Sequence, residues 1–152
     1  MTDDEKIKIE PDFNRALQIW HEGKPLEAIQ ILKNLDKNSP NQAAILGMIG
    51  GIYFSLDDWK NSYIYYKKTA ELSPKSESAS IALFHSLFEL KKYDESFNEI
   101  KRFLAISKKL NIKLKKYNLL INDWKKEFNL NTDDYFEITE AVSQDLKTSL
   151  KN

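Results

Sequence analysis

Histidine and cysteine, the side chains that most often do chemistry or bind transition metals, are scarce in this sequence. The 152 residues contain no cysteine and only two histidines, His21 and His85. A zinc site needs three or four ligands at short spacings, and metallopeptidases place two histidines one helical turn apart. The glycine-rich run 47–51 lacks the following Lys-Ser or Lys-Thr of a phosphate-binding loop. We therefore expect no metal, no cofactor and no catalytic residue, so the sequence does not predict an enzyme.

The elements that carry these residues repeat with a period of 34 residues. A turn residue, a small residue and a helix-ending residue recur at this spacing as Gly23, Ala28 and Pro40, then Asp57, Ser62 and Pro74, then Lys91, Ser96 and Lys108. Between these positions, apolar residues follow helical spacing, and the prolines cannot extend a helix. No strand-like alternation competes with this pattern. The sequence therefore predicts an all-α fold built from helix pairs.

The recurring positions resemble the tetratricopeptide repeat family. The second repeat, 43–76, matches the family pattern best, with Leu46, Ile49, Gly50, Tyr53, Trp59, Ser62, Tyr66, Thr69 and Pro74. The resemblance implies a solenoid of three helix pairs (9–42, 43–76 and 77–110) after a flexible N-terminus at 1–8. It also implies that the chain binds other polypeptides. The third repeat has Lys108 where the family has proline, which suits a chain that continues into something other than a fourth repeat.

Residues 111–152 are predicted to form a helical C-terminal cap. Apolar residues lie on one stripe of the first segment, at Leu114, Tyr117, Ile121, Trp124 and Phe128. We expect Asn131 or Thr132 to cap a second helix, whose first turn would hold Asp133 and Asp134. A terminal helix with one polar face closes the open core of a repeat array.

Composition limits the partners and the compartment. The formal net charge is zero, and only two arginines stand against 21 lysines, so we expect no nucleic-acid partner. The uncharged stretch 43–56 is too short to span a bilayer, so we expect no membrane partner. The N-terminus lacks the apolar core of a secretory signal, and cysteine is absent. These features predict a soluble, cytoplasmic protein.

In the resembled family, the partner lies on the concave face, which the first helix of each pair lines. Carried over to this sequence, the partner-binding positions are Phe13, Leu17, Trp20, His21, Gly47, Gly51, Phe54, Ser55, Ile81, His85 and Phe88. These positions hold no lysine, arginine or asparagine, so they do not resemble the subfamily that clamps C-terminal carboxylates. Gly47 and Gly51 lie one turn apart and predict a bare strip of backbone. A partner, the chain's own C-terminal helix, or simple drift from the consensus would each account for that strip.

These observations predict a protein–protein interaction module with an apolar, aromatic-lined groove, acting as a small chaperone or adaptor. Two alternatives stay open. An immunity or antitoxin-type protein would mask a cognate toxin through a broad surface that includes the lysines at 108–116. A structural protein would self-associate, as a homodimer for example, and bury its exposed aromatic residues. A solvated outer face is the simpler interpretation of the lysines, because such faces are common.

Overall fold

The computed structural model describes residues 3–151 and confirms the all-α fold. Every regular element in this range is a helix, and the chain divides into two compact units, 1–73 and 74–152. Each unit has its own apolar core.

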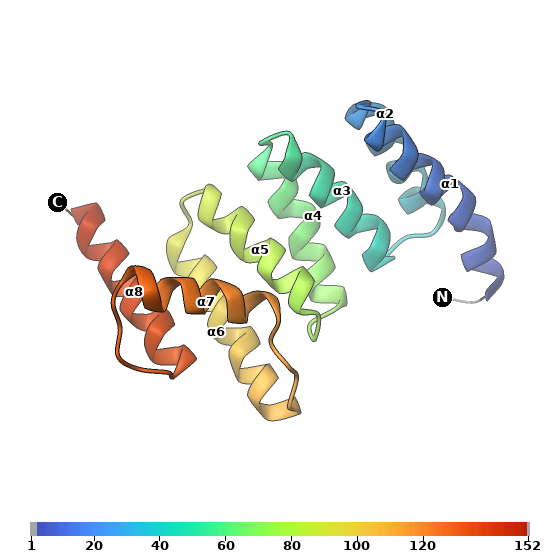
Figure 1. The fold of residues 1–152 in the computed structure, drawn as a ribbon. Helices are drawn as coiled ribbons and strands as arrows, with labels where there is room; N and C mark the ends of the chain where they lie inside the picture. Colours follow the sequence, from blue (N-terminus) through green and yellow to red (C-terminus); the bar gives the residue numbers. More distant parts are fainter. Residues whose placement is uncertain (1–2, 152) are drawn as a thin grey trace. The chain divides into compact units, whose positions relative to one another are not determined.

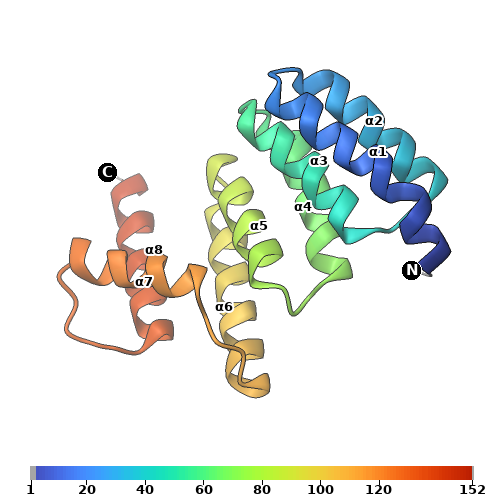
Figure 2. The ribbon, with the colours of Figure 1, turned by 45° about the vertical axis from the view of Figure 1, so that its right-hand side comes forward.

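Unit 1 contains four helices, and each packs against the next one in the sequence. They are α1 (Asp3–His21), α2 (Pro25–Asn38), α3 (Ala43–Ser55) and α4 (Trp59–Leu72). Successive helices pack against each other, and α1 and α3 lie side by side in both views of the ribbon (Figure 1 and Figure 2). The core residues of this unit come from the first three helices and are Ala16, Ala28, Ile29, Leu32, Leu35, Ile45, Ile49 and Ile52.

Unit 2 begins with a helix pair and continues into two helices of the predicted cap. Its elements are α5 (Glu77–Glu89), α6 (Tyr93–Leu110), α7 (Lys116–Glu127) and α8 (Tyr135–Lys151). The helix α7 packs against α5 and α8, and α8 packs against α6. Tyr117 and Ile121 of the predicted stripe are fully buried, and Leu114 and Trp124 are partly buried against the same core.

The three predicted turns share one backbone arrangement, with a residue in the left-handed region and the same hydrogen bond. Gly23, Asp57 and Lys91 have φ angles of 82°, 58° and 61°, which is the left-handed region. In each turn the next residue donates its N–H to a carbonyl five residues earlier, for example Lys92 to Leu87 at 2.9 Å. This is the Schellman arrangement that ends a helix. The 34-residue spacing of the turns is therefore a real structural repeat.

A buried polar network joins three helices of unit 2. Glu99 is 9% exposed and accepts hydrogen bonds from the Ser80 hydroxyl at 2.6 Å and from two nitrogens of Arg102 at 2.6 and 2.8 Å. The Ser80 hydroxyl also lies 2.8 Å from the Tyr117 hydroxyl, and burial raises the pKa of Tyr117. Arg102 further donates to the carbonyl of Pro74 at 3.1 Å. The network thus satisfies every polar group that α7 buries there.

Glu77 determines where α7 begins. Its carboxylate accepts hydrogen bonds from the backbone N–H groups of Lys115, Lys116 and Tyr117 at 2.9–3.2 Å. These N–H groups have no partners within the helix, and a carboxylate is favourable at this positive end. A residue of α5 therefore caps α7 from a distance in sequence.

We expected a flexible N-terminus at 1–8. In the structure the backbone from Asp3 onward belongs to α1, and residues 1–2 lie outside the described part. One sequence prediction needs correction. We expected Asn131 or Thr132 to cap the last helix. Asp134 does so, since its carboxylate accepts the N–H of Glu137 at 2.9 Å, while Thr132 accepts the N–H of Asp134. The cap lies closer to the helix because α8 begins only at Tyr135.

Replacing Lys91 by glycine should stabilise the protein. A non-glycine residue in the left-handed region costs about 1–2 kcal/mol, and the greater chain entropy of glycine offsets part of that gain. We expect a net gain of about 0.5–1 kcal/mol in the free energy of unfolding, measured by chemical denaturation. Gly23→Ala is the converse control: open space surrounds its missing Cβ, so it should lose stability through backbone strain alone. Equal stability of both variants and wild type would contradict the turn geometry.

Replacing Glu77 by alanine should loosen the start of α7. Loss of hydrogen bonds to a charged acceptor costs about 1.5–3 kcal/mol. Amide hydrogen exchange at Lys115, Lys116 and Tyr117 should accelerate in this variant. The matched control is Glu89→Ala, an exposed glutamate at the other end of α5, which should leave that exchange unchanged. Unaltered exchange in Glu77→Ala would show that the cap does not hold α7.

Candidate binding surface

The predicted residues of α1 lie on one face of the helix. Phe13, Leu17 and Trp20 are half-buried and spaced by four and three residues, so they share one stripe. Phe13 and Trp20 pack partly against the core of unit 1. His21 is exposed, and its ring stacks on Trp20 with 6.0 Å between ring centroids. This stripe therefore keeps apolar and aromatic atoms at the surface.

The predicted bare strip on α3 is covered in part by α4. A Cβ atom added to Gly47 would lie 3.4 Å from Cγ2 of Thr69, and one added to Gly51 would lie 3.3 Å from the Tyr66 hydroxyl. Both glycines are half-buried. The expectation of an uncovered backbone was wrong in this respect, because the absent side chains point toward α4. Side chains of α4, Thr69 and Tyr66, occupy the space next to these two glycines.

Phe54 and Ser55 close the C-terminal end of α3. The Phe54 ring packs edge-on against Trp59, with 4.8 Å between ring centroids, and lies 6.4 Å from the Tyr66 ring. Ser55 is exposed, and its hydroxyl donates to the carbonyl of Ile52 at 2.6 Å. We use the name α1–α3 face for the eight predicted positions in this unit, of which Gly47 and Gly51 are turned toward α4. They are Phe13, Leu17, Trp20, His21, Gly47, Gly51, Phe54 and Ser55.

The three predicted positions in unit 2 are less available. Ile81 and Phe88 are half-buried and pack against the core that includes residues of α7. His85 is exposed next to Phe84, and partial loss of solvent lowers its pKa, while Glu89 opposes that shift. The binding role of these three positions stays a prediction.

Tyr66 is the residue that sequence reasoning did not assign to this surface. Its ring covers Gly50, where a Cβ atom would lie 2.8 Å from Cδ1, and its hydroxyl lies 3.3 Å from the position of a Cβ atom on Gly51. Burial raises the pKa of this hydroxyl. The available signal was the spacing of Ser62 and Tyr66 on one face of α4. Ser62 approaches α3 closely enough to donate to the Gly50 carbonyl at 3.1 Å, so Tyr66, one turn along the same face of α4, also faces α3.

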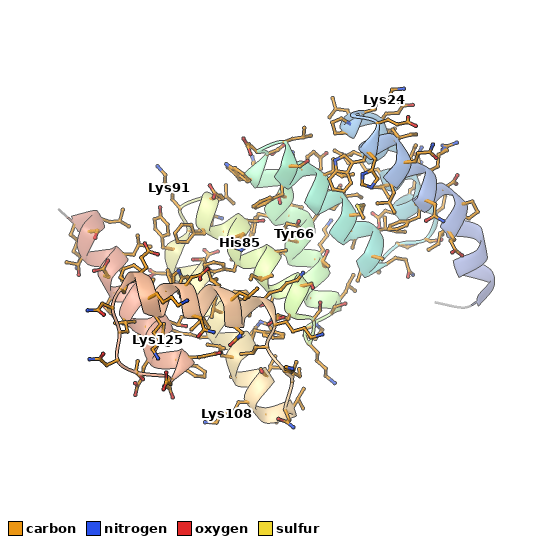
Figure 3. All side chains as sticks on the ribbon, viewed as in Figure 1. Lys24, Tyr66, His85, Lys91, Lys108 and Lys125 are labelled. Atoms are coloured by element: carbon orange, nitrogen blue, oxygen red, sulfur yellow. The ribbon has the colours of Figure 1, made fainter. Side chains whose placement is uncertain are left out.

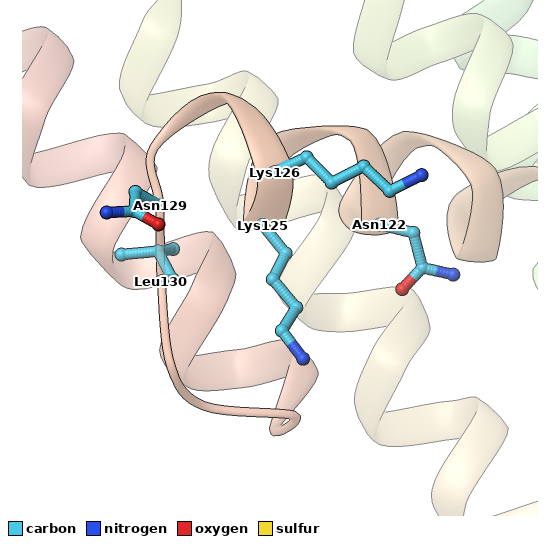
Figure 4. Close-up of a pocket in the computed structure, with 5 residues that line it drawn as sticks. All are labelled: Asn122, Lys125, Lys126, Asn129 and Leu130. Atoms are coloured by element: carbon cyan, nitrogen blue, oxygen red, sulfur yellow. The ribbon is translucent and has the colours of Figure 1, made fainter.

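A cavity of about 450 Å³ lies elsewhere, at the C-terminal end of α7. Asn122, Lys125, Lys126, Asn129 and Leu130 line it, and the two lysine side chains point in different directions (Figure 4). Lys125 is already paired with Asp133. Within residues 3–151, no group of three His, Asp or Glu side chains is placed to hold a metal ion. In the same range, no helix combines the length and apolarity that crossing a membrane requires.

Comparison with known proteins gives similarity in structure alone. No family model matches the sequence, and no curated protein matches it. Among solved structures, the first TPR of Spaghetti (RPAP3) bound to the HSP90 peptide SRMEEVD has a TM-score of 0.62 and 14% identity, covering 97% of this chain and 96% of that one. MamA 41-end from Desulfovibrio magneticus RS-1 has a TM-score of 0.61 and 18% identity, covering 99% and 92%.

This chain has the tetratricopeptide-repeat fold. The low identity leaves the fold as the shared property. Among the predicted positions of unit 1, α1 and α3 supply the exposed and half-exposed aromatic side chains. The binding role of the α1–α3 face stays a prediction.

The glycines of α3 allow a matched test of this geometry. Gly50→Ala should lower the free energy of unfolding by about 1–3 kcal/mol, because the Tyr66 ring must move to admit the methyl group. Gly47→Ala meets only ordinary contact with Thr69 and should hold or raise stability by up to about 1 kcal/mol through helix propensity. Thermal denaturation of both variants measures the difference. The geometry would be wrong if Gly50→Ala were the more stable variant.

Proposed function

We propose that this chain binds another polypeptide on the α1–α3 face and acts as a small chaperone or adaptor, with the cytoplasm as its compartment. The stripe of Phe13, Leu17 and Trp20 supports this proposal, because half-exposed aromatic and aliphatic side chains gather there on one helix face. Aromatic residues with partly exposed rings are typical anchors of protein interfaces. The shared fold with a peptide-bound TPR adds to this support.

The chemistry of the face favours an apolar ligand over an acidic one. The peptide in the RPAP3 complex, SRMEEVD, ends in an acidic residue and carries two further glutamates. The α1–α3 face offers such a peptide no lysine, arginine or asparagine, and His21 is its single cationic candidate. A carboxylate buried there would lack an ionic partner, which is costly. We therefore propose a partner segment that presents leucine, methionine or aromatic side chains.

A second candidate role is the masking of a folded cognate toxin, in the manner of an immunity protein. The unpaired lysines near the end of α6 support this role, because a broad contact with a folded acidic protein would use them. No catalytic role is proposed for either candidate.

Leu17→Glu should weaken binding of an apolar peptide at least about tenfold, which corresponds to about 1.4 kcal/mol. The probe is a fluorescent peptide selected against the wild-type chain from a random library. Leu26→Glu is the matched control, since it introduces the same charge at a leucine of α2 that is 71% exposed and outside the α1–α3 face. Fluorescence anisotropy measures both affinities, and thermal denaturation checks that both variants remain folded.

The peptide SRMEEVD serves as the comparison ligand and should bind the wild-type chain at least about tenfold more weakly than the selected peptide. Equal loss in Leu17→Glu and Leu26→Glu would contradict the assigned face. Preferential binding of SRMEEVD would contradict the apolar character of the ligand.

A further inference from the structure

One end of unit 2 carries a concentration of positive charge without matching carboxylates. Residues 105–122 include five lysines and neither aspartate nor glutamate, although the whole chain is neutral. We call these five side chains the lysine patch: Lys108, Lys109, Lys113, Lys115 and Lys116. All five are exposed. In Figure 3 Lys108 extends from the end of α6 into open space.

Several carboxylates of unit 2 already form ion pairs with other cations. In unit 2, Glu99 pairs with Arg102, Glu140 with Lys101, Asp133 with Lys125 and Asp94 with Lys147. Glu77 is the acidic residue nearest to the patch in contact terms, and its carboxylate accepts three backbone N–H groups at the start of α7. None of the ion pairs in the described range uses a lysine of the patch. Within the described range, the five lysines therefore have no ion-pair partner, and Glu77 is the negative charge beside them.

Two leucines lie among these lysines and face solvent. Leu110, which ends α6, is 46% exposed, and Leu119 on α7 is 67% exposed. Leu119 is three residues after Lys116, so the two side chains are neighbours on the helix surface. The surface thus combines several cations with exposed aliphatic side chains. Solvation of the lysines alone does not account for these exposed leucines.

The backbone that presents the lysine patch is fixed. Asn111 ends α6 in the left-handed region, and the Ser107 hydroxyl donates to the carbonyl of Ile112 at 2.6 Å. Ile112 and Leu114 pack against the unit 2 core, whereas Lys113 and Lys115, which alternate with them in sequence, are exposed. A surface that is already ordered loses little entropy when it binds.

We propose that the lysine patch, with Leu110 and Leu119, docks an acidic polypeptide segment that also carries aliphatic side chains. Charge complementarity selects the segment, since five exposed lysines gather around a single carboxylate, that of Glu77. The leucines supply apolar contact with its aliphatic residues. This surface belongs to unit 2, and the proposal does not depend on the α1–α3 face.

A polypeptide fits this surface better than a nucleic acid or a membrane. Single-stranded nucleic acids are held by stacking on exposed aromatic rings, and the aromatic residue of this segment, Tyr117, is buried with its hydroxyl next to Ser80. A helix that lies on a membrane exposes its apolar face to lipid. The apolar face of α7, with Tyr117 and Ile121, is instead buried in the protein core.

The test uses the full chain and a fluorescent synthetic peptide that repeats Glu-Leu-Asp. The triple variant Lys108→Glu, Lys109→Glu, Lys113→Glu should bind this peptide at least about tenfold more weakly than wild type, and Leu119→Ser about threefold more weakly. The control is Lys24→Glu, Lys37→Glu, Lys60→Glu, which makes the same change of charge at exposed lysines of unit 1 and should alter affinity less than about twofold. Lys115 and Lys116 are left intact because their backbone joins the cap with Glu77.

Each outcome supports or overturns the proposal. Loss confined to the patch variants supports it. It would be overturned by the absence of peptide binding to wild type, or by equal losses in the two triple variants, since either result leaves only non-specific charge. Tighter and patch-dependent binding of phosphatidylserine vesicles or of single-stranded polyuridylate would also overturn it in favour of a membrane or a nucleic acid. The patch variants leave the α1–α3 face unaltered, and Leu17→Glu leaves the lysine patch unaltered. Failure of the lysine-patch proposal can therefore be distinguished from failure of the proposed function.

Discussion

The helix pairs depend on one steric constraint, which is a small side chain buried where two helices cross. Ala28, Ser62 and Ser96 occupy the same position in three successive repeats, and each is fully buried. The serines can be buried because their hydroxyls donate to carbonyls, Ser62 to Gly50 and Ser96 to Tyr93. A larger residue would separate the helices and open the left-handed turn that precedes it. Small residues therefore recur every 34 positions because the two helices of each pair approach closely there.

The facing position explains why the third pair differs from the first two. Ala16 and Gly50 are small, but the equivalent residue 34 positions later is Phe84, which is 2% exposed. Its ring packs against Phe97 of α6 and Trp124 of α7, with 6.0 Å between centroids in each case. A large ring at this position provides contact area that α7 covers. The array therefore ends here through an aromatic cluster, and α7 lies against α5.

The sequence could predict the features that depend on local rules. The turns at Gly23, Asp57 and Lys91 and the buried small residues follow from spacing alone, and the structure confirms them. The direction in which Gly47 and Gly51 face was not predictable in this way, because it depends on where Tyr66 and Thr69 of another helix lie. The cap at the start of α7 was not predictable for the same reason. Its cap comes from Glu77, and no local pattern relates residues so far apart in sequence.

The buried network of unit 2 is better understood as a determinant of position than as a source of stability. The ion pair between buried Glu99 and the partly exposed Arg102 contributes little net stability compared with apolar residues of equal volume, yet removing Arg102 would leave the buried carboxylate without its ionic partner. Any other placement of α7 would withdraw Tyr117 from Ser80, and it would separate Glu77 from the amides that it caps. These hydrogen bonds therefore fix the arrangement of the segment between α6 and α7. Because that segment carries the lysine patch, the spacing of its charges is set by groups in the interior, and surface substitutions can change the charge without changing the spacing.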